Sequence, residues 1–154
     1  MGQIDKRLAE LGITLPEAAK PVANYVPWVR TGNLVFISGQ GPLEGGKVQY
    51  PGALGRDVSL EDGIKSARLC AINVLAQLKD AVGGDLDRVK RIVKLLGFVN
   101  ATADFKDHPK VINGASDLMV DVFGDKGRHA RSAVASPSLP MGISTEVEAI
   151  VEVE

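Results

Sequence analysis

The stretch from Leu60 to Val82 constrains the fold most, because its pattern predicts one long helix with a single apolar face. Ser59, with Asp62 three residues later, suits an N-cap arrangement, and two glycines end the segment. The apolar side chains keep the three-to-four-residue step of one helix face: Ile64, Ala67, Ala71, Leu75, Leu78 and Val82. Such a helix must bury its apolar stripe against a second layer, so a layered fold is expected.

Two shorter helices are predicted, one on each side of this segment. Residues 3–11 form the first, which ends at Gly12 and keeps helical spacing at Ile4, Leu8 and Leu11. In the second, Pro109 suits the first turn and Gly124 the end. Between them the apolar residues recur at helical steps: Val111, Ala115, Leu118 and Val122.

The N-terminal part of the chain also predicts two short strands. Residues 25–40 (YVPWVRTGNLVFISGQ) predict two short strands around a turn at residues 31–33. Pro27 cannot donate a hydrogen bond to a neighbouring strand, so the first strand is expected at a sheet edge. Residues 14–24 are expected to be irregular, and residues 39–58, which are rich in glycine, to form a long loop.

Three further strands are predicted beyond the long helix. Residues 88–100 place three apolar side chains on one face: Val93, Leu95 and Val99. Residues 132–135 form a short strand. Residues 145–153 alternate strictly, with a buried face made of Val147, Ala149, Val151 and Val153.

The resulting order is β-β-α-β-α-β-β behind a short N-terminal helix, which predicts an α+β fold with both main helices on one face of the sheet. We expect a single domain over residues 1–154, in which residues 1–24 are an N-terminal extension with a short helix. Residues 34–38 (LVFIS) carry apolar side chains for both sheet faces. A bare apolar face normally finds a partner, so self-association is expected.

Composition narrows the class of protein. The net charge is −1 and the pI is about 6.1, whereas a nucleic-acid surface needs a concentrated excess of Lys and Arg, so no nucleic-acid partner is expected. Cys70 is the only cysteine, which excludes an intrachain disulfide and favours the interpretation of a small buried side chain over a reactive thiol. The sequence has no secretory h-region and no apolar run long enough for a membrane span, so a cytoplasmic protein without membrane contact is expected.

Arg131 is the best candidate for ligand binding. It follows a turn that contains glycine and precedes a short apolar strand, so its guanidinium would project into a cleft, where it suits a carboxylate or a phosphate. The alternative is a surface arginine paired with a glutamate. Four glutamates of the last strand share one side of it, because side chains alternate with a period of two: Glu146, Glu148, Glu152 and Glu154. They either form a solvated face only, or one of them orients a water molecule in a pocket.

Other reactive patterns are weak. Ser38 does not form a nucleophile elbow, because that motif needs glycine where Phe36 stands. Ser38 and Gly39 are either a strand end that lets a ligand approach the backbone or a simple turn. His108 and His129 lie in segments without metal-ligand spacing, and the sequence has no phosphate loop or dinucleotide motif. Neither a metal nor a cofactor is expected.

With these residues in view, the chain resembles the YjgF/YER057c/UK114 family, also called the Rid or reactive-intermediate deaminase family. The resemblance runs from about Tyr25 to Val153. The chain is most similar to a subgroup of the family with an extended N-terminus and a longer segment at residues 104–116. The segments that carry it are GNLVFISGQGPL, the long helix, KLLGFVN with a following DF, ARSAV, LP and EVEAIVEV.

The resemblance implies a chorismate-mutase-like fold with a mixed sheet, a homotrimer and three equivalent clefts between subunits. It implies hydrolysis of 2-imino or 2-enamino acids to 2-keto acids and ammonia, as in a 2-iminobutanoate/2-iminopropanoate deaminase. Arg131 would bind the substrate carboxylate and Glu146 would hold the attacking water. The remaining residues implied to contact the substrate are Tyr25, Ser38, Gly39, Asn113 and Ala133.

The chain departs from the family pattern at three places. Ala133 replaces a frequent cysteine, whose implied ligand contact is through the backbone. His129 stands where proline or alanine is usual, and Pro137 stands where a small or basic residue is usual. Two other functions remain open from the sequence. One is a non-enzymatic trimer that binds a small carboxylate or regulates a partner. The other is an endoribonuclease, a label common in the family, which the lack of a histidine pair or basic track disfavours.

Overall fold

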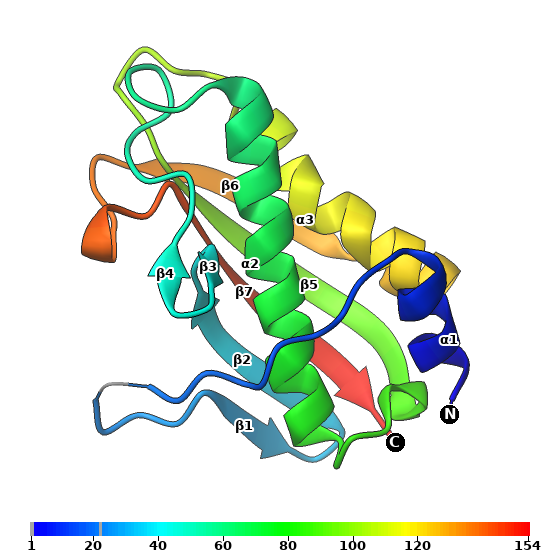
Figure 1. Cartoon of the computed structure of the whole chain (residues 1–154). Coiled ribbons are helices and arrows are strands. Elements are labelled where there is room, and N and C mark those ends of the chain that lie inside the picture. The colour runs from blue at the N-terminus through cyan, green and yellow to red at the C-terminus, as the bar shows by residue number, and fades with distance from the viewer. Residues whose placement is uncertain (1, 22) are drawn as a thin grey trace.

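Two long helices lie across one face of a five-stranded mixed sheet (Figure 1), as the sequence predicts. The structure is a computed structural model and describes residues 2–21 and 23–154. The helices are α1 (Gln3–Glu10), α2 (Leu60–Ala81) and α3 (His108–Phe123). The sheet has the order β1-β2-β7-β5-β6, and its strands are β1 (Trp28–Thr31), β2 (Leu34–Gln40), β5 (Val89–Asn100), β6 (Ala130–Ser136) and β7 (Thr145–Val153).

The helix ends follow the expected capping chemistry. The Ser59 hydroxyl accepts a hydrogen bond from the Asp62 backbone N–H at 3.1 Å, which caps α2. Pro109 lies in the first turn of α3, and Gly124 ends that helix with a φ of 64°. Within the described ranges no helix has the length and hydropathy needed to cross a bilayer.

Strand pairing is antiparallel except at one edge. β7 lies between β2 and β5 and pairs with both in antiparallel register, whereas β5 pairs with β6 in parallel. β1 forms the opposite edge, as Pro27 predicts. The alternation predicted for β7 is confirmed, because four of its residues are buried under the helices: Val147, Ala149, Val151 and Val153.

Two details of the sequence-based expectation are wrong. In β5 the buried residue is Ile92 rather than Val93, because a register shift between Ile92 and Lys94 reverses which side chains face the helices. Residues 39–58 contain a small hairpin, β3 (Leu43–Glu44) and β4 (Lys47–Val48), where a loop was expected. Strands of two residues are too short to show a period.

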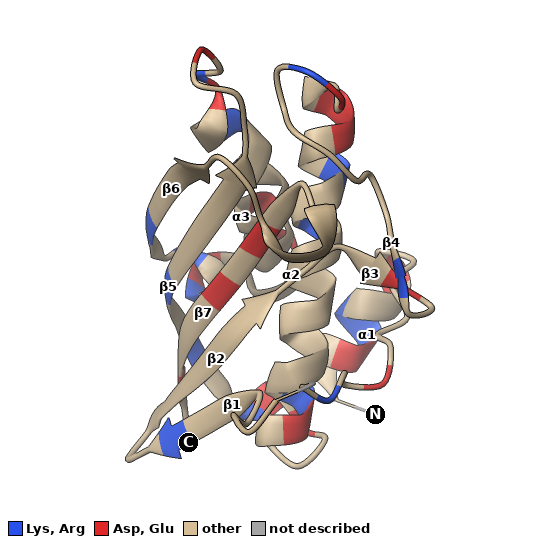
Figure 2. Cartoon of the chain, turned by 90° about the vertical axis from the view of Figure 1, so that its left-hand side faces the viewer, with Lys and Arg blue, Asp and Glu red and all other residues tan. Residues whose placement is uncertain are grey.

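The sheet face opposite the helices is uncovered in a single chain. Figure 2 shows this face of β7, with its acidic positions between β2 and β5. Apolar side chains share the face: Phe36 and Val134 are exposed, and Leu34, Leu96, Phe98 and Ile150 are only partly buried. The open face is therefore apolar around a row of carboxylates.

The N-terminal extension is attached to the helical layer rather than to the sheet. The backbone N–H groups of Gln3 and Ile4 both donate to the Asp87 carboxylate at 2.9 Å, which caps α1 and lowers the pKa of Asp87. Arg7 Nε donates to the Asp121 carbonyl of α3 at 2.7 Å. The chain then crosses over α2 before it enters β1 (Figure 1). The extension thus covers the outer side of the helices.

The close contact between α2 and α3 depends on Gly114. A Cβ at this position would overlap the Ile64 carbonyl oxygen and stand 3.2 Å from the Arg68 backbone nitrogen. Both are backbone atoms, so the helices must separate to admit it. We expect Gly114→Ala to lower the free energy of unfolding by about 1–3 kcal/mol, measured by urea denaturation.

Gly63→Ala is the matched control for this prediction. It lies on α2, and an added Cβ there would meet only the end of the Leu54 side chain, at 2.8 Å. Alanine also favours a helix interior over glycine by about 0.5–1 kcal/mol. Gly63→Ala should therefore cost clearly less stability than Gly114→Ala, and equal losses would contradict the assigned contact.

Candidate functional site

Arg131 lies on the helix-covered side of the sheet, at its β6 edge. Its register partner on β5 is Leu95, which is fully buried under the helices. The guanidinium Nη1 donates to Asn113 Oδ1 at 2.8 Å and to Ser116 Oγ at 3.2 Å, and both acceptors lie on α3. Across the described ranges no carboxylate lies within ion-pair distance of Arg131. The alternative of an arginine paired with a glutamate is therefore wrong for this chain.

A histidine that the sequence does not connect to Arg131 joins this group. His129 Nε2 lies 2.9 Å from Ser116 Oγ, and His129 Nδ1 lies 2.6 Å from the Gly127 carbonyl. Burial lowers the pKa of His129, and the nearby charge of Arg131 lowers it further, although the bond to Gly127 opposes both. His129 is thus held in its neutral form at pH 7.

Glu146 lies on the opposite, uncovered face. Its register partner on β5 is Phe98, and its neighbour Val147 points to the buried side. The half-buried carboxylate stands directly against Gly39, where a Cβ would come within 2.8 Å of Glu146 Cδ. Burial raises the pKa of Glu146, and the charge of Glu148 two residues along raises it further. A carboxyl with a raised pKa is suited to exchanging protons.

Gly39 lies beside Glu146 at an irregularity in β2, and Ser38 precedes it in the chain. The β2–β7 register shifts between Ile37 and Gln40, which brings the exposed Gly39 backbone next to the carboxylate. The backbone N–H and the hydroxyl of Ser38 both donate to the Pro27 carbonyl at 3.0 Å. Tyr25, two residues before Pro27, is 56% exposed, so its ring is free to contact another molecule.

The predicted site residues therefore form two separate groups in one chain. Arg131 and Asn113 lie on the helix-covered face, together with Ala133, which pairs with the buried Gly97. Glu146 and Gly39 lie on the open face, next to Ser38 and the segment of Tyr25. The sheet separates the two groups, so one chain alone does not bring the guanidinium and the carboxylate together.

A buried polar cluster supports the first residues of β7, and the sequence gives no periodic signal for it. Ser66 on α2 is within hydrogen-bond distance of the Ser144 and Thr145 hydroxyls, at 2.7 and 2.6 Å. Cys70 Sγ lies 3.2 Å from Thr145 Oγ1, is fully buried, and has a pKa raised by burial to about 12. The expectation of a buried cysteine is confirmed, and the raised pKa disfavours the reactive thiolate.

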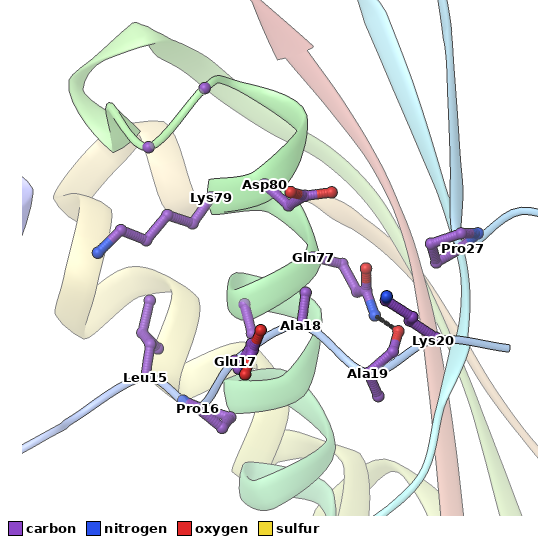
Figure 3. Close-up of a pocket in the computed structure, with 13 residues that line it drawn as sticks. Leu15, Pro16, Glu17, Ala18, Ala19, Lys20, Pro27, Gln77, Lys79 and Asp80 are labelled. Atoms are coloured by element: carbon purple, nitrogen blue, oxygen red, sulfur yellow. Dashed lines mark hydrogen bonds between the residues drawn. The ribbon is translucent and has the colours of Figure 1, made fainter.

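The hollow drawn in Figure 3 lies elsewhere, between the N-terminal extension and the C-terminal half of α2. Its volume is about 550 Å³. Gln77, which is buried, donates from Nε2 to the Ala19 carbonyl at 2.6 Å and so fastens the extension to α2. None of the predicted site residues lines this hollow. No group of three His, Cys, Asp or Glu side chains suited to a metal ion occurs in residues 2–21 and 23–154.

Comparison with known proteins relates the whole chain to one family. The family model described as "YjgF/chorismate mutase-like, putative endoribonuclease" matches residues 5–153. Protein TCP17 of Trypanosoma cruzi is 46% identical over 152 residues, which cover 98% of this chain and 94% of TCP17.

Solved structures agree with this relationship. The crystal structure of Atu1372 from Agrobacterium tumefaciens, a protein of unknown function, is 50% identical, with a TM-score of 0.93 over 98% of this chain and 92% of that chain. Escherichia coli TdcF with bound serine is 25% identical, with a TM-score of 0.65 over 90% of this chain and 94% of that chain. The extent of the family match and the shared fold lead to one conclusion: the chain belongs to the YjgF/chorismate mutase-like family.

Proposed function

We propose that this protein hydrolyses 2-imino and 2-enamino acids to 2-keto acids and ammonia. The observation that carries the proposal is Arg131, a half-buried guanidinium held by two neutral acceptors, Asn113 and Ser116, with no carboxylate partner among the described residues. An arginine without a counter-charge in such a position is suited to the carboxylate of a small ligand. TdcF, which has bound serine in its crystal structure, gives independent support, because serine carries such a carboxylate.

Glu146 fits the second requirement of this reaction. The carbon of a protonated imine is already electrophilic, so catalysis needs mainly a positioned water and a group that accepts its proton. Water oxygen bonds to C2 while Glu146 takes a water proton, which gives a carbinolamine. The protonated Glu146 then returns the proton to the amine nitrogen. As the C–N bond breaks, the carboxylate takes the hydroxyl proton, the C=O bond forms, and the proton passes to the departing ammonia, so the 2-keto acid and ammonium leave. An enamine first takes a proton at C3 and becomes the imine.

The opposite placement of the two groups fits a site shared between protomers. Arg131 lies at the β6 edge and Glu146 on the open, partly apolar face. A second copy that covers this face would bury Phe36 and Val134, which are 41% and 44% exposed, and would carry its own Arg131 toward Glu146. We propose a homotrimer, in which each of three equivalent contacts forms one such site.

The direct test is keto-acid release from an imine made in place. An L-amino-acid oxidase converts 2-aminobutanoate to 2-iminobutanoate, and formation of 2-oxobutanoate is followed with and without the protein. We expect acceleration that is lost in Glu146→Gln. If the protein binds 2-oxobutanoate but accelerates nothing across several amino acids, it is a carboxylate-binding protein without turnover. RNA cleavage that survives both rigorous purification and Arg131→Ala would instead support the endoribonuclease function.

Gly39→Ala should displace the Glu146 carboxylate. It should leave ligand binding largely intact, because the implied ligand contact of Gly39 is its backbone amide, which alanine keeps. An added Cβ would collide with Glu146 Oε2, and the free end of that side chain would move rather than the backbone. We expect kcat to fall about 10- to 100-fold, because small displacements of a catalytic group cost that much. The affinity for 2-oxobutanoate, measured by calorimetry, should change little. Gly41→Ala is the control, since its Cβ would meet only the Leu43 and Ile143 side chains.

The rate should also depend on pH through Glu146. Its carboxyl must be ionised to accept a proton, so kcat/KM should fall as the pH drops through its raised pKa. The Glu148 charge contributes to the raised pKa, and Glu148→Gln removes that charge. Glu146 would then stay ionised at lower pH, and the acidic limb of the pH–rate profile should shift to lower pH. An unchanged limb, or one at higher pH, would exclude Glu146 as the titrating base.

A further inference from the structure

A chain of hydrogen bonds links Gly127, His129, Ser116 and Arg131. The chemistry of each group determines which atom donates and which accepts in each bond. A carbonyl oxygen only accepts hydrogen bonds, so His129 Nδ1, 2.6 Å from the Gly127 carbonyl, carries the proton. In the neutral ring Nε2 is then an acceptor, and the Ser116 hydroxyl at 2.9 Å must donate to it. The Ser116 oxygen therefore presents its lone pairs away from the histidine.

Those lone pairs face Arg131. Nη1 of Arg131 lies 3.2 Å from Ser116 Oγ and 2.8 Å from Asn113 Oδ1. One guanidinium nitrogen carries two hydrogens, so these two acceptors use both. Asn113 and Ser116 are three residues apart on α3 and lie on the same side of the helix. The hydrogen bonds found in the described chain leave the Nε and Nη2 donors of Arg131 unused.

We propose that Ser116 and His129 are positioning residues, which orient the Arg131 guanidinium so that its Nε–Nη2 edge, rather than its Nη1–Nη2 end, binds the substrate carboxylate. Two parallel N–H donors on that edge match the two oxygens of a carboxylate. This inference rests on the proposed function, because it assigns the orientation of the group that binds the substrate there.

The hydrogen bonds that run from Gly127 through His129 and Ser116 to Arg131 are called the relay below. Their physical role is to reduce the conformational freedom of the Arg131 side chain before the ligand binds. An arginine side chain carries about 2 kcal/mol of rotamer entropy, part of which is lost on binding unless it is held beforehand. The hydrogen bond to His129 Nε2 fixes the rotation of the Ser116 hydroxyl, so that its lone pairs stay directed at Nη1. Removal of either residue should therefore weaken carboxylate binding through the same step.

The test is a double-mutant cycle on ligand affinity with 2-oxobutanoate as the probe. We expect Ser116→Ala and His129→Phe each to weaken the Kd about ten-fold. The double variant should be no weaker than either single variant, because both break one relay. With 2-iminobutanoate as substrate, KM should rise while kcat stays near the wild-type value, since Glu146 is untouched. Additive losses, or a fall confined to kcat, would overturn the assignment.

A conservative variant separates the relay from simple packing. In His129→Gln the side-chain amide oxygen can still accept the Ser116 proton, so the Kd should stay within about two-fold of wild type. If His129→Gln is as weak as His129→Phe, the relay is wrong. Ser138→Ala, the same change as Ser116→Ala at an exposed serine outside this chain of hydrogen bonds, is the control.

Arg131→Ala distinguishes failure of this inference from failure of the proposed function. If Arg131→Ala loses binding while Ser116→Ala and His129→Phe keep the wild-type affinity, the positioning role of Ser116 and His129 is wrong and the proposed function stands. If Arg131→Ala itself keeps the wild-type affinity, the proposed carboxylate-binding site is wrong.

Discussion

Mixing two inactive variants, Arg131→Ala and Glu146→Gln, should restore imine hydrolysis. The physical reason is the placement of the two side chains on opposite faces of the sheet, at registers Leu95 and Phe98 of β5. A site that needs both groups then takes Arg131 from one protomer and Glu146 from the next. If two kinds of chain assort at random, about one quarter of the contacts combine an intact arginine with an intact glutamate.

The experiment uses differently tagged chains that are co-expressed, or unfolded and refolded together, and purified through both tags. Each variant assembled alone should be inactive. The doubly tagged species should recover about one third of the wild-type activity, because a mixed trimer always contains one intact site among its three contacts. Purification through both tags ensures that mixed assemblies are present. Mixed assemblies without activity would contradict the shared site, because they contain every group in intact form but on different chains.

Arg131→Ala should strongly weaken carboxylate binding by the assembled protein. The substitution removes the charge and the unused Nε–Nη2 edge, and it leaves Asn113 and Ser116 without their donor. We expect the Kd for 2-oxobutanoate to weaken by about 100-fold, the usual effect of truncating a charge-paired group in a closed site. Arg131→Lys should recover part of the affinity, because an ammonium restores the charge without the fork.

Arg128→Ala is the matched control for this result. Arg128 lies three residues earlier, is exposed, and pairs with Asp125 through Nε at 3.3 Å. Its loss changes the net charge by the same amount and removes no group of the proposed site, so the affinity should stay near the wild-type value. Equal losses in both variants would mean that the net charge, and no specific guanidinium, attracts the ligand.

Much of the architecture follows from local patterns. The strand predicted at residues 145–153 and the helix that starts at Leu60 have these bounds in the structure, because strict alternation and a capped apolar stripe each permit only one secondary structure over such lengths. The small hairpin around residues 43–48 and the inward turn of Ile92 were not predictable in this way. A two-residue strand has no period, and a bulge changes the period where it occurs.

The candidate site was only partly predictable for a similar reason. Arg131 and Glu146 are recognisable in the sequence through their motifs. Ser116 lies on α3 and His129 lies thirteen residues later, just before β6, and no local pattern joins them. Their hydrogen bond exists because β6 pairs in parallel with β5 beneath α3. Pairing of that kind depends on contacts between distant segments.

The sequence by itself determined the main helices and strands, the buried side of β7, and which charged groups are available for chemistry. Periodicity is a local property, and it relates a residue only to neighbours on the same element. The tertiary structure alone decided that Arg131 turns toward α3, on the side of the sheet opposite to the one that carries Glu146. That outcome depends on how each strand is registered against the next, which is settled by packing across the whole sheet.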